Sequence, residues 1–204
     1  MKKCAVLHEP GDIVTLAGTR FVVLDVERRG SLPDSLFLLA LESVGASEFG
    51  SSNNYAESDL KKAVDKWLED MGKRGLDNAK LIPREIDLTT LDGSGCYGKL
   101  SVKAAPLTLD EAREYADIIP NAERWCWLAT GWSGPSKSDG DLALYVSSNG
   151  DWNGNRCCSS SYGIRPALKA PSILFEDSEA GLDLSKIPTD DLLQEIHRRL
   201  AEKA

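Results

Sequence analysis

Cysteines and histidines are the side chains of this sequence best suited to covalent or metal chemistry. No Cys-x-x-Cys pair occurs, and the two histidines, His8 and His197, lie near opposite ends of the chain, so the spacing of a zinc site is absent. Adjacent Cys157 and Cys158 suggest a redox pair, but a disulfide between neighbouring residues is strained. We therefore expect isolated thiols on a polar surface, with no metal and no cofactor. The five cysteines are Cys4, Cys96, Cys126, Cys157 and Cys158.

Acid/base and phosphate chemistry have weaker candidates. Asp139, Asp141 and Asp151 could form an acid/base pair, but alternating charged loop residues are usually only solvated. The glycine-rich stretch 93–98 lacks the spacing of a phosphate-binding loop and precedes no good helix start, which favours a plain turn. The sequence therefore predicts no catalytic residue.

Residues 147–162 suit recognition better than catalysis. Nearly all of them are small and polar, with aromatic residues and one arginine among them and no aliphatic side chain. Such a segment cannot supply a hydrophobic core, so we expect it to face solvent and to bind a ligand. The predicted ligand-binding side chains are Ser147, Asn149, Asp151, Asn153, Asn155, Arg156, Cys157, Cys158, Ser159, Ser161 and Tyr162.

Three tryptophans and one arginine accompany this segment. Trp127, Trp132 and Trp152 are predicted to act as scaffold residues or ligand anchors. For Trp152 the sequence leaves both readings open, an anchor for a ligand or a core plug that fixes the loop. Arg165, which precedes a proline, is expected to hydrogen-bond loop carbonyls rather than to contact a ligand.

Strands on either side of the segment must position it. Residues 11–26 predict a β-hairpin with its turn at 17–19. Trp125 and Trp127 alternate with their neighbours, as on a strand that carries both indoles on one face. Pro166 should confine the last strand to an edge or a bulge. The other predicted strands are 36–41, 142–146 and 164–169.

Three helices are predicted. Ser58 is the N-cap of the first, whose apolar residues recur at helical spacing until Gly72 and Gly75 end it. Thr108 begins the second with a capping box, and Ala112, Tyr115, Ala116 and Ile119 form its buried face. Thr189 begins the third, whose apolar stripe either folds back on the domain or docks on a partner or a second copy.

Composition limits the class of partner. The chain has 204 residues and a formal net charge of −8, which argues against nucleic acid as the main partner. No apolar run is long enough to cross a bilayer, and the first apolar run is too short for a signal peptide. We therefore expect synthesis in the cytoplasm, with virion association or export by another route left open. The predicted organisation is a domain at 1–172 and a linker with an amphipathic helix at 173–204.

Several motifs in a fixed order resemble a known family. They are Lys66-Trp67-Leu68, Trp125-Cys126-Trp127-Leu128-Ala129-Thr130, Tyr145-Val146 followed by Gly150, and Gly163-Ile164-Arg165-Pro166-Ala167-Leu168. Together they resemble the C-type-lectin-fold variable proteins of diversity-generating retroelements of phages and bacteria. The order is more distantly similar to formylglycine-generating enzymes, which share that scaffold. The resemblance covers about residues 10–170.

The resemblance implies an α+β, C-type-lectin-like fold with two helices packed on antiparallel sheets and a long, loop-rich ligand face. It also implies massive sequence variation before Gly163, by reverse transcription that changes adenines. Asn codons altered in this way cannot encode Lys, Glu, Gln, Met or Trp, and only Trp152 among residues 147–162 is of these types. The expected function is then receptor binding, with a protein or a glycan as the ligand and no enzymatic activity.

Two alternatives remain at this point. One is a fixed structural module of a virion or cell envelope, assembled through its last helix. The other is a formylglycine-generating type of enzyme, for which Cys126, Cys157 and Cys158 are the candidate thiols. Glu-Pro-Asn and Gln-Pro-Asp triplets are absent, and Asp151-Trp152-Asn153 only loosely resembles the calcium motif of lectins, so calcium-mediated sugar binding is not predicted.

Overall fold

A β-hairpin opens the part of the chain that the computed structural model describes, namely residues 8–30, 32–158 and 161–175 with Thr189 and Leu193. Strand β1 (Ile13–Leu16) pairs antiparallel with β2 (Thr19–Arg29). Ala17 and Gly18 form the turn, with φ angles of 46° and 76°. Positive φ at both positions gives a turn whose twist matches that of paired strands, and the predicted hairpin is confirmed.

The first sheet continues from this hairpin in the order β1-β2-β3-β12-β7, where β3 is Leu32–Ala40, β12 is Ala167–Pro171 and β7 is Ala104–Ala105. Because β12 lies between β3 and β7, the predicted edge position of the last strand is wrong. The strand begins after Pro166, whose carbonyl accepts a hydrogen bond of 2.9 Å from the Ala40 amide. Pro166 therefore contributes an acceptor without needing the N–H that it lacks.

The second sheet has the order β10-β9-β8-β11-β4. Strand β8 pairs antiparallel with β9, but it pairs parallel with β11 at Gly163 and Cys126, so the expectation of purely antiparallel sheets is wrong. The strands are β4 (Ala46–Ser47), β8 (Cys126–Gly131), β9 (Leu142–Val146), β10 (Trp152–Arg156) and β11 (Tyr162–Gly163). A separate two-stranded sheet pairs β5 (Arg84–Asp87) with β6 (Lys99–Val102).

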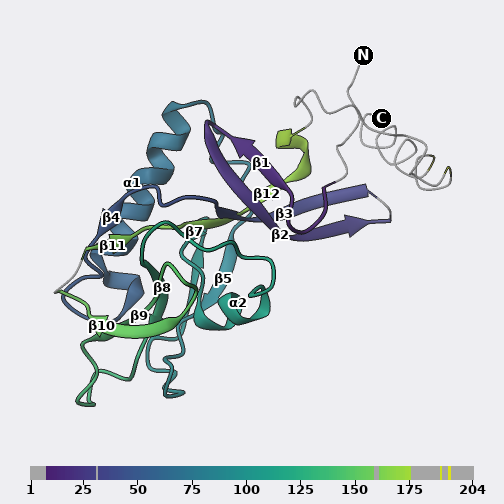
Figure 1. Ribbon diagram of the computed structural model, residues 1–204. Coiled ribbons are helices and arrows are strands. Elements are labelled where there is room, and N and C mark those ends of the chain that lie inside the picture. Colours follow the sequence, from purple (N-terminus) through teal and green to yellow (C-terminus); the bar gives the residue numbers. More distant parts are fainter. Residues whose placement is uncertain (1–7, 31, 159–160, 176–188, 190–192, 194–204) are drawn as a thin grey trace.

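The N-caps predicted at Ser58 and Thr108 are confirmed. Ser58 Oγ accepts from the Lys61 amide at 2.9 Å and begins α1 (Asp59–Lys73), after the short 3-10 helix η1 (Tyr55–Glu57). Thr108 and Glu111 form the capping box of α2 (Leu109–Glu114). Helix α2 is shorter than predicted, because Tyr115 is already its C-cap and the following residues form turns. The described residues thus form an α+β fold of mostly strands with two α-helices (Figure 1).

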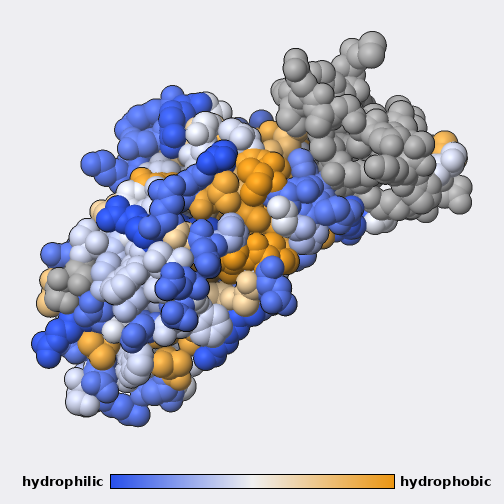
Figure 2. Space-filling view, viewed as in Figure 1, coloured by the Kyte–Doolittle hydropathy of each residue, from blue (hydrophilic) through white to orange (hydrophobic). Residues whose placement is uncertain are grey.

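Two hydrophobic clusters occupy opposite faces of the first sheet. In β2 the side chains of Phe21 and Val23 belong to one cluster, which also contains Trp67 of α1. Those of Val22 and Leu24 belong to the other, together with residues of α2. Alternation along a strand explains the division, since successive side chains point to opposite faces. Figure 2 shows hydrophobic side chains at the surface where β2 passes between β1 and α2.

The second sheet joins both clusters in the same way. Trp127 of β8 and Tyr145 of β9 belong to the first cluster, whereas the neighbouring Leu128 and Leu144 belong to the second. Strands β8 and β9 are therefore fixed by packing on both faces. Strand β10 is the last strand in the sheet order and, among the described residues, pairs with β9 alone, so its position is set by β9.

The end of the described chain remains packed on the domain. The 3-10 helix η2 (Ser172–Phe175) ends at Phe175, which is 5% exposed and meets the His8 ring edge-on at 5.8 Å. The predicted C-terminal helix falls outside the described residues, apart from Thr189 and Leu193. None of the helices within the described ranges has the length and apolar character needed to span a bilayer.

Candidate functional site

The predicted ligand-binding segment is built on a β-hairpin of β9 and β10 rather than on a loop alone. Trp152 pairs with Val146 and Arg156 with Leu142. Ser147 organises the turn, because its hydroxyl oxygen accepts from the amides of Asn149 at 3.2 Å and Asp151 at 3.1 Å. Ser147 is half-buried in this role, so its side chain is held by the turn.

One face of β10 carries Trp152, Gly154 and Arg156. Trp152 is 41% exposed, and the Arg113 guanidinium of α2 lies over its ring at 5.5 Å. An indole so exposed does not plug the core, so of the two readings only the ligand anchor is kept, as a proposal. Gly154 lies against the ring of Trp132, and a Cβ atom at this position would be 2.3 Å from Trp132 Cε3. The Trp132 ring therefore packs directly against the backbone of β10 at Gly154.

The other face of β10 carries Asn153 and Asn155 above a group of aromatic rings. Asn153 lies directly opposite Tyr145, and Asn155 donates a hydrogen bond to the Tyr162 hydroxyl. Residues directly opposite each other in an antiparallel pair share a face of the sheet. Trp125 stacks on Tyr145 with ring centroids 5.1 Å apart and an interplanar angle of 13°. We call Trp125, Tyr145, Asn153, Asn155 and Tyr162 the aromatic face.

Trp125 is a site residue that the sequence prediction missed. It is 43% exposed, whereas Trp127 is 1% exposed and donates from Nε1 to the Ser47 carbonyl at 2.9 Å. Of the two roles predicted for Trp127, scaffold residue and ligand anchor, its burial supports the first. Alternation along the strand predicts that Trp125 and Trp127 lie on one side of the sheet. It does not predict that Trp125 is exposed to solvent, because this depends on tertiary packing.

The expectation that residues 147–162 face solvent is wrong for Cys157. Its side chain is 1% exposed, and burial raises the pKa of its thiol to about 12. Its backbone is held as well: the carbonyl accepts from the amides of Phe49 at 3.0 Å and Gly50 at 3.2 Å. Cys157 therefore attaches the segment to the scaffold, while the neighbouring Cys158 is exposed.

The remaining predicted residues lie at or near the surface. Among the described ones, Ser147, Asn155 and Tyr162 are half-buried, and Ser159 falls outside the described residues. Accessible side chains thus occur on both faces of β10 and in its flanking turns. The exposed predicted residues are Asn149, Asp151, Asn153, Arg156, Cys158 and Ser161.

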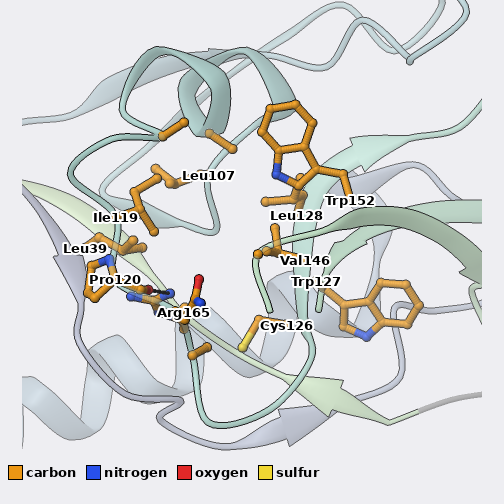
Figure 3. Close-up of a pocket in the computed structure, with 15 residues that line it drawn as sticks. Leu39, Leu107, Ile119, Pro120, Cys126, Trp127, Leu128, Val146, Trp152 and Arg165 are labelled. Carbon is orange, nitrogen blue, oxygen red and sulfur yellow. Dashed lines mark hydrogen bonds between the residues drawn. The ribbon is translucent and has the colours of Figure 1, made fainter. Parts of the chain in front are cut away.

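An apolar cavity of about 110 Å³ adjoins the hairpin on the side of α2. Its walls belong largely to the second hydrophobic cluster, and Leu39, Leu107 and Leu128 are among them. Figure 3 shows Trp152 and Arg165 on opposite sides of this cavity.

Arg165 occupies the structural role that the sequence predicts. Its Nε donates to the Ala40 carbonyl at 2.9 Å and its Nη1 to the Pro120 carbonyl at 3.1 Å. Near it lies Cys126, whose thiol pKa burial raises to about 11 even though Arg165 acts in the opposite direction. The Cys126 thiol is therefore protonated at neutral pH and is a weak nucleophile.

Comparisons with protein-family models, with curated proteins and with solved structures found no match to this chain.

Proposed function

We propose that this protein recognises a ligand through the surface formed by residues 147–162 and that this surface is diversified in sequence. The observation that carries the proposal is the construction of β10. Its backbone is fixed by pairing with β9, while Asn153 and Arg156 project into solvent. Exposed side chains on a rigid strand can change with little effect on folding, since the core lies elsewhere.

The aromatic face supports recognition by its chemistry. Trp125 offers a flat, rigid apolar surface, and the amides of Asn153 and Asn155 offer donors and acceptors beside it. Rigid rings next to adaptable polar groups are the combination used by paratopes and by sites that bind sugars or proteins. The ligand class that we propose is accordingly a protein or a glycan.

The scaffold that we propose is the C-type-lectin-like fold of diversity-generating retroelement variable proteins. Three features support this reading: the order of the motifs, the N-terminal hairpin with α1, and the polar segment 147–162 directly before Gly163-Ile164-Arg165-Pro166. In this reading the buried Cys157 and the tightly packed Gly154 are fixed positions between variable ones.

Sequencing this gene deeply across a population of its source, with the flanking DNA, tests the proposal. We expect substitutions to concentrate at adenine-containing codons of Asp151, Asn153, Asn155 and Ser161, together with an unchanged near-copy of the segment close by. Gly154 and Cys157 should stay constant among folded variants, because a larger side chain at Gly154 meets Trp132.

A second outcome of the same experiment would contradict the proposal. If residues 147–162 were the same throughout the population and the flanking DNA held no near-copy, the protein would instead be a fixed binding or structural module. Codons of α1 that encode exposed residues, such as Lys62 and Lys66, serve as the internal control, since they should not vary more than the rest of the gene.

A further inference from the structure

The backbone amide of Gly154 is in contact with the side-chain amide of Asn153. The Gly154 N–H donates a hydrogen bond of 2.8 Å to Asn153 Oδ1. Because Oδ1 is bonded to Cγ, the Gly154 nitrogen lies beside the carbon of the side-chain amide. A bond between this nitrogen and Cγ would close a succinimide ring. The fold therefore holds the nucleophile and the electrophile of one reaction next to each other, which removes much of the entropic cost of bringing them together.

The pairing of β10 with β9 leaves the Gly154 amide outside the hydrogen bonds between the two strands. Before β10, the Ser147 amide donates to the Asp151 carbonyl at 2.8 Å. After it, the Cys157 amide donates to the Asp141 carbonyl at 2.9 Å. The register between these two pairs is continuous. Because every second residue of an antiparallel strand bonds to the partner strand, the Gly154 amide points away from β9.

Exposure and the absence of a side chain favour attack at this position. Asn153 is exposed, so hydroxide and water reach its side chain. Gly154 has no Cβ atom to obstruct the approach of its nitrogen to Cγ, and its backbone rotates more freely than that of other residues. Strand β10 is the last in its sheet order, so the rotation that ring closure requires disturbs, among the described strands, only the pairing with β9.

Two other asparagines of the hairpin each have one of these features without the other. Asn155 has the same contact, because the Arg156 amide donates to its Oδ1 at 2.8 Å, but Arg156 carries a side chain. Asn149 precedes a glycine, but the Gly150 amide donates to a backbone carbonyl of the turn at 3.0 Å. The pair at 153–154 combines the contact with the glycine.

We propose that Asn153 is a site of spontaneous deamidation. Hydroxide removes the proton of the Gly154 amide, and the nitrogen attacks Asn153 Cγ. The new N–C bond closes the succinimide ring, and the side-chain nitrogen leaves as ammonia with a proton from water. Water then opens the ring at one of its two carbonyl carbons. Cleavage of the new bond gives aspartate, whereas cleavage of the original peptide bond gives isoaspartate, whose chain continues through the former side chain.

Either product changes the aromatic face. Aspartate places a negative charge where a neutral amide lies opposite Tyr145. Isoaspartate adds a methylene group to the backbone, so the following residues of β10 no longer match their partners in β9. The modification does not depend on the proposed function, because it needs only the contact between Asn153 and Gly154. It would alter recognition by a fixed surface and by a diversified one alike.

Peptide mapping by mass spectrometry, on the purified full chain kept at pH 8, tests the proposal. Exchange of an amide for a carboxyl group raises the mass of the modified residue, and electron-transfer fragmentation distinguishes isoaspartate from aspartate. In the native protein Asn153 should react at least about tenfold faster than Asn155, because the side chain that follows Asn155 raises the barrier to ring closure. Asn153 should also react faster than Asn149. The rates should increase with pH, since hydroxide removes the amide proton.

The same measurement in urea separates the effect of the fold from that of the local sequence. Asn149 and Asn153 should then react at similar rates, because both precede a glycine and neither retains its native contacts. Asn153→Gln is the matched variant at this exposed position. Its longer side chain closes a larger and less favourable ring, so modification at this position should be lost while the rate at Asn149 stays the same.

Two results would each overturn the proposal. One is a rate at native Asn153 that does not exceed the rate at Asn155. The other is a ratio of the Asn153 rate to the Asn149 rate that is no higher in the native protein than in urea, since the fold would then not promote the reaction.

Discussion

Gly154 illustrates how strictly a single position of β10 can be constrained. A Cβ atom there would lie 2.3 Å from Trp132 Cε3, and real Cβ atoms do not approach other atoms so closely. The neighbouring Asn153 is exposed and meets no such restriction. The segment is therefore not uniformly tolerant: Gly154 at the centre of β10 is constrained by its contact with Trp132, while Trp152, Asn153 and Arg156 are exposed.

For Gly154→Ala we expect a loss of about 1–3 kcal/mol in the free energy of unfolding, because the methyl group must displace the Trp132 ring. In a Trp132→Ala background the same change should cost close to nothing. Urea unfolding of the four variants measures this coupling. Gly95→Ala is the control, since no heavy atom lies within 4 Å of its ideal Cβ position. Equal costs of Gly154→Ala in both backgrounds would contradict the proposed contact.

Thiol reactivity offers a second test at single residues. Cys96 and Cys158 are exposed, whereas Cys126 and Cys157 are buried with thiol pKa values raised to about 11 and about 12. Iodoacetamide at pH 8 should therefore label the first two in the native protein and leave the other two unlabelled. Peptide mapping by mass spectrometry measures the labelling, and labelling in urea provides the control. Native labelling of Cys157 would mean that the segment is not anchored there.

The hairpin of β9 and β10 shows where prediction from sequence succeeds and where it stops. Strand β9 was predicted, because Leu142–Val146 is a continuous apolar run. Strand β10 was not, since Trp-Asn-Gly-Asn-Arg has little preference for a strand and becomes one only by pairing with β9. The N-caps at Ser58 and Thr108 were predictable because the signal lies within four residues.

Features that join distant parts of the chain could not be predicted. The parallel pairing of Gly163 with Cys126 and the burial of Cys157 depend on contacts with residues far away in the sequence. The same holds for the exposure of Trp125, which stacks on a residue of another strand. For Arg165 the structural role was predicted, but its apolar cavity involves residues from 39 to 165 and has no local signal.

For residues 147–162 we expect that replacing exposed side chains leaves the fold intact. The combined variant Asp151→Ser, Asn153→Tyr, Ser161→Tyr should differ from the parent by about 0.5 kcal/mol or less per site, because these side chains are exposed. Trp127→Ala, a buried position of the adjoining scaffold, should cost about 3–5 kcal/mol. Thermal and urea unfolding measure both. A large loss in the combined variant would show that the exposed residues are structural.

On the scale of the whole molecule, the two sheets share two hydrophobic clusters, so neither sheet can lose its packing alone. Phe21 and Trp127 belong to the same cluster although they lie in different sheets, and Leu24 and Leu128 are related in the same way. We infer that the described domain unfolds as one unit, with the buried groups of both sheets exposed to solvent together.

Alkaline pH should therefore destabilise the whole domain. Cys126 and Cys157 have pKa values near 9 when unfolded and about 11 and 12 when folded. The stability that their neutral forms contribute is complete below pH 9 and is lost as the pH rises from 9 toward the folded values, at about 1.4 kcal/mol for each pKa unit. Buried Tyr55, whose pKa is also raised by burial, acts in the same direction.

Urea unfolding at pH 8, 9, 10 and 11 with a thiol reductant measures this dependence. Cys126→Ala should make the curve less steep, while Cys158→Ala, at an exposed thiol, should leave the slope unchanged. A free energy of unfolding that stays constant between pH 9 and 11 would contradict the assignment of buried, neutral thiols.

The position of β10 at the end of the sheet order has a consequence for solubility. A strand that pairs on only one side presents a row of backbone donors and acceptors, which can pair with the same strand of another molecule and begin aggregation. Charged Asp151 directly precedes β10, charged Arg156 is its last residue, and Gly154, which has no side chain, lies at its centre. The range of sequences that the hairpin can adopt is then limited less by the requirement to fold than by the requirement to avoid self-association. Those that lose both charges and gain β-branched residues should aggregate while still native.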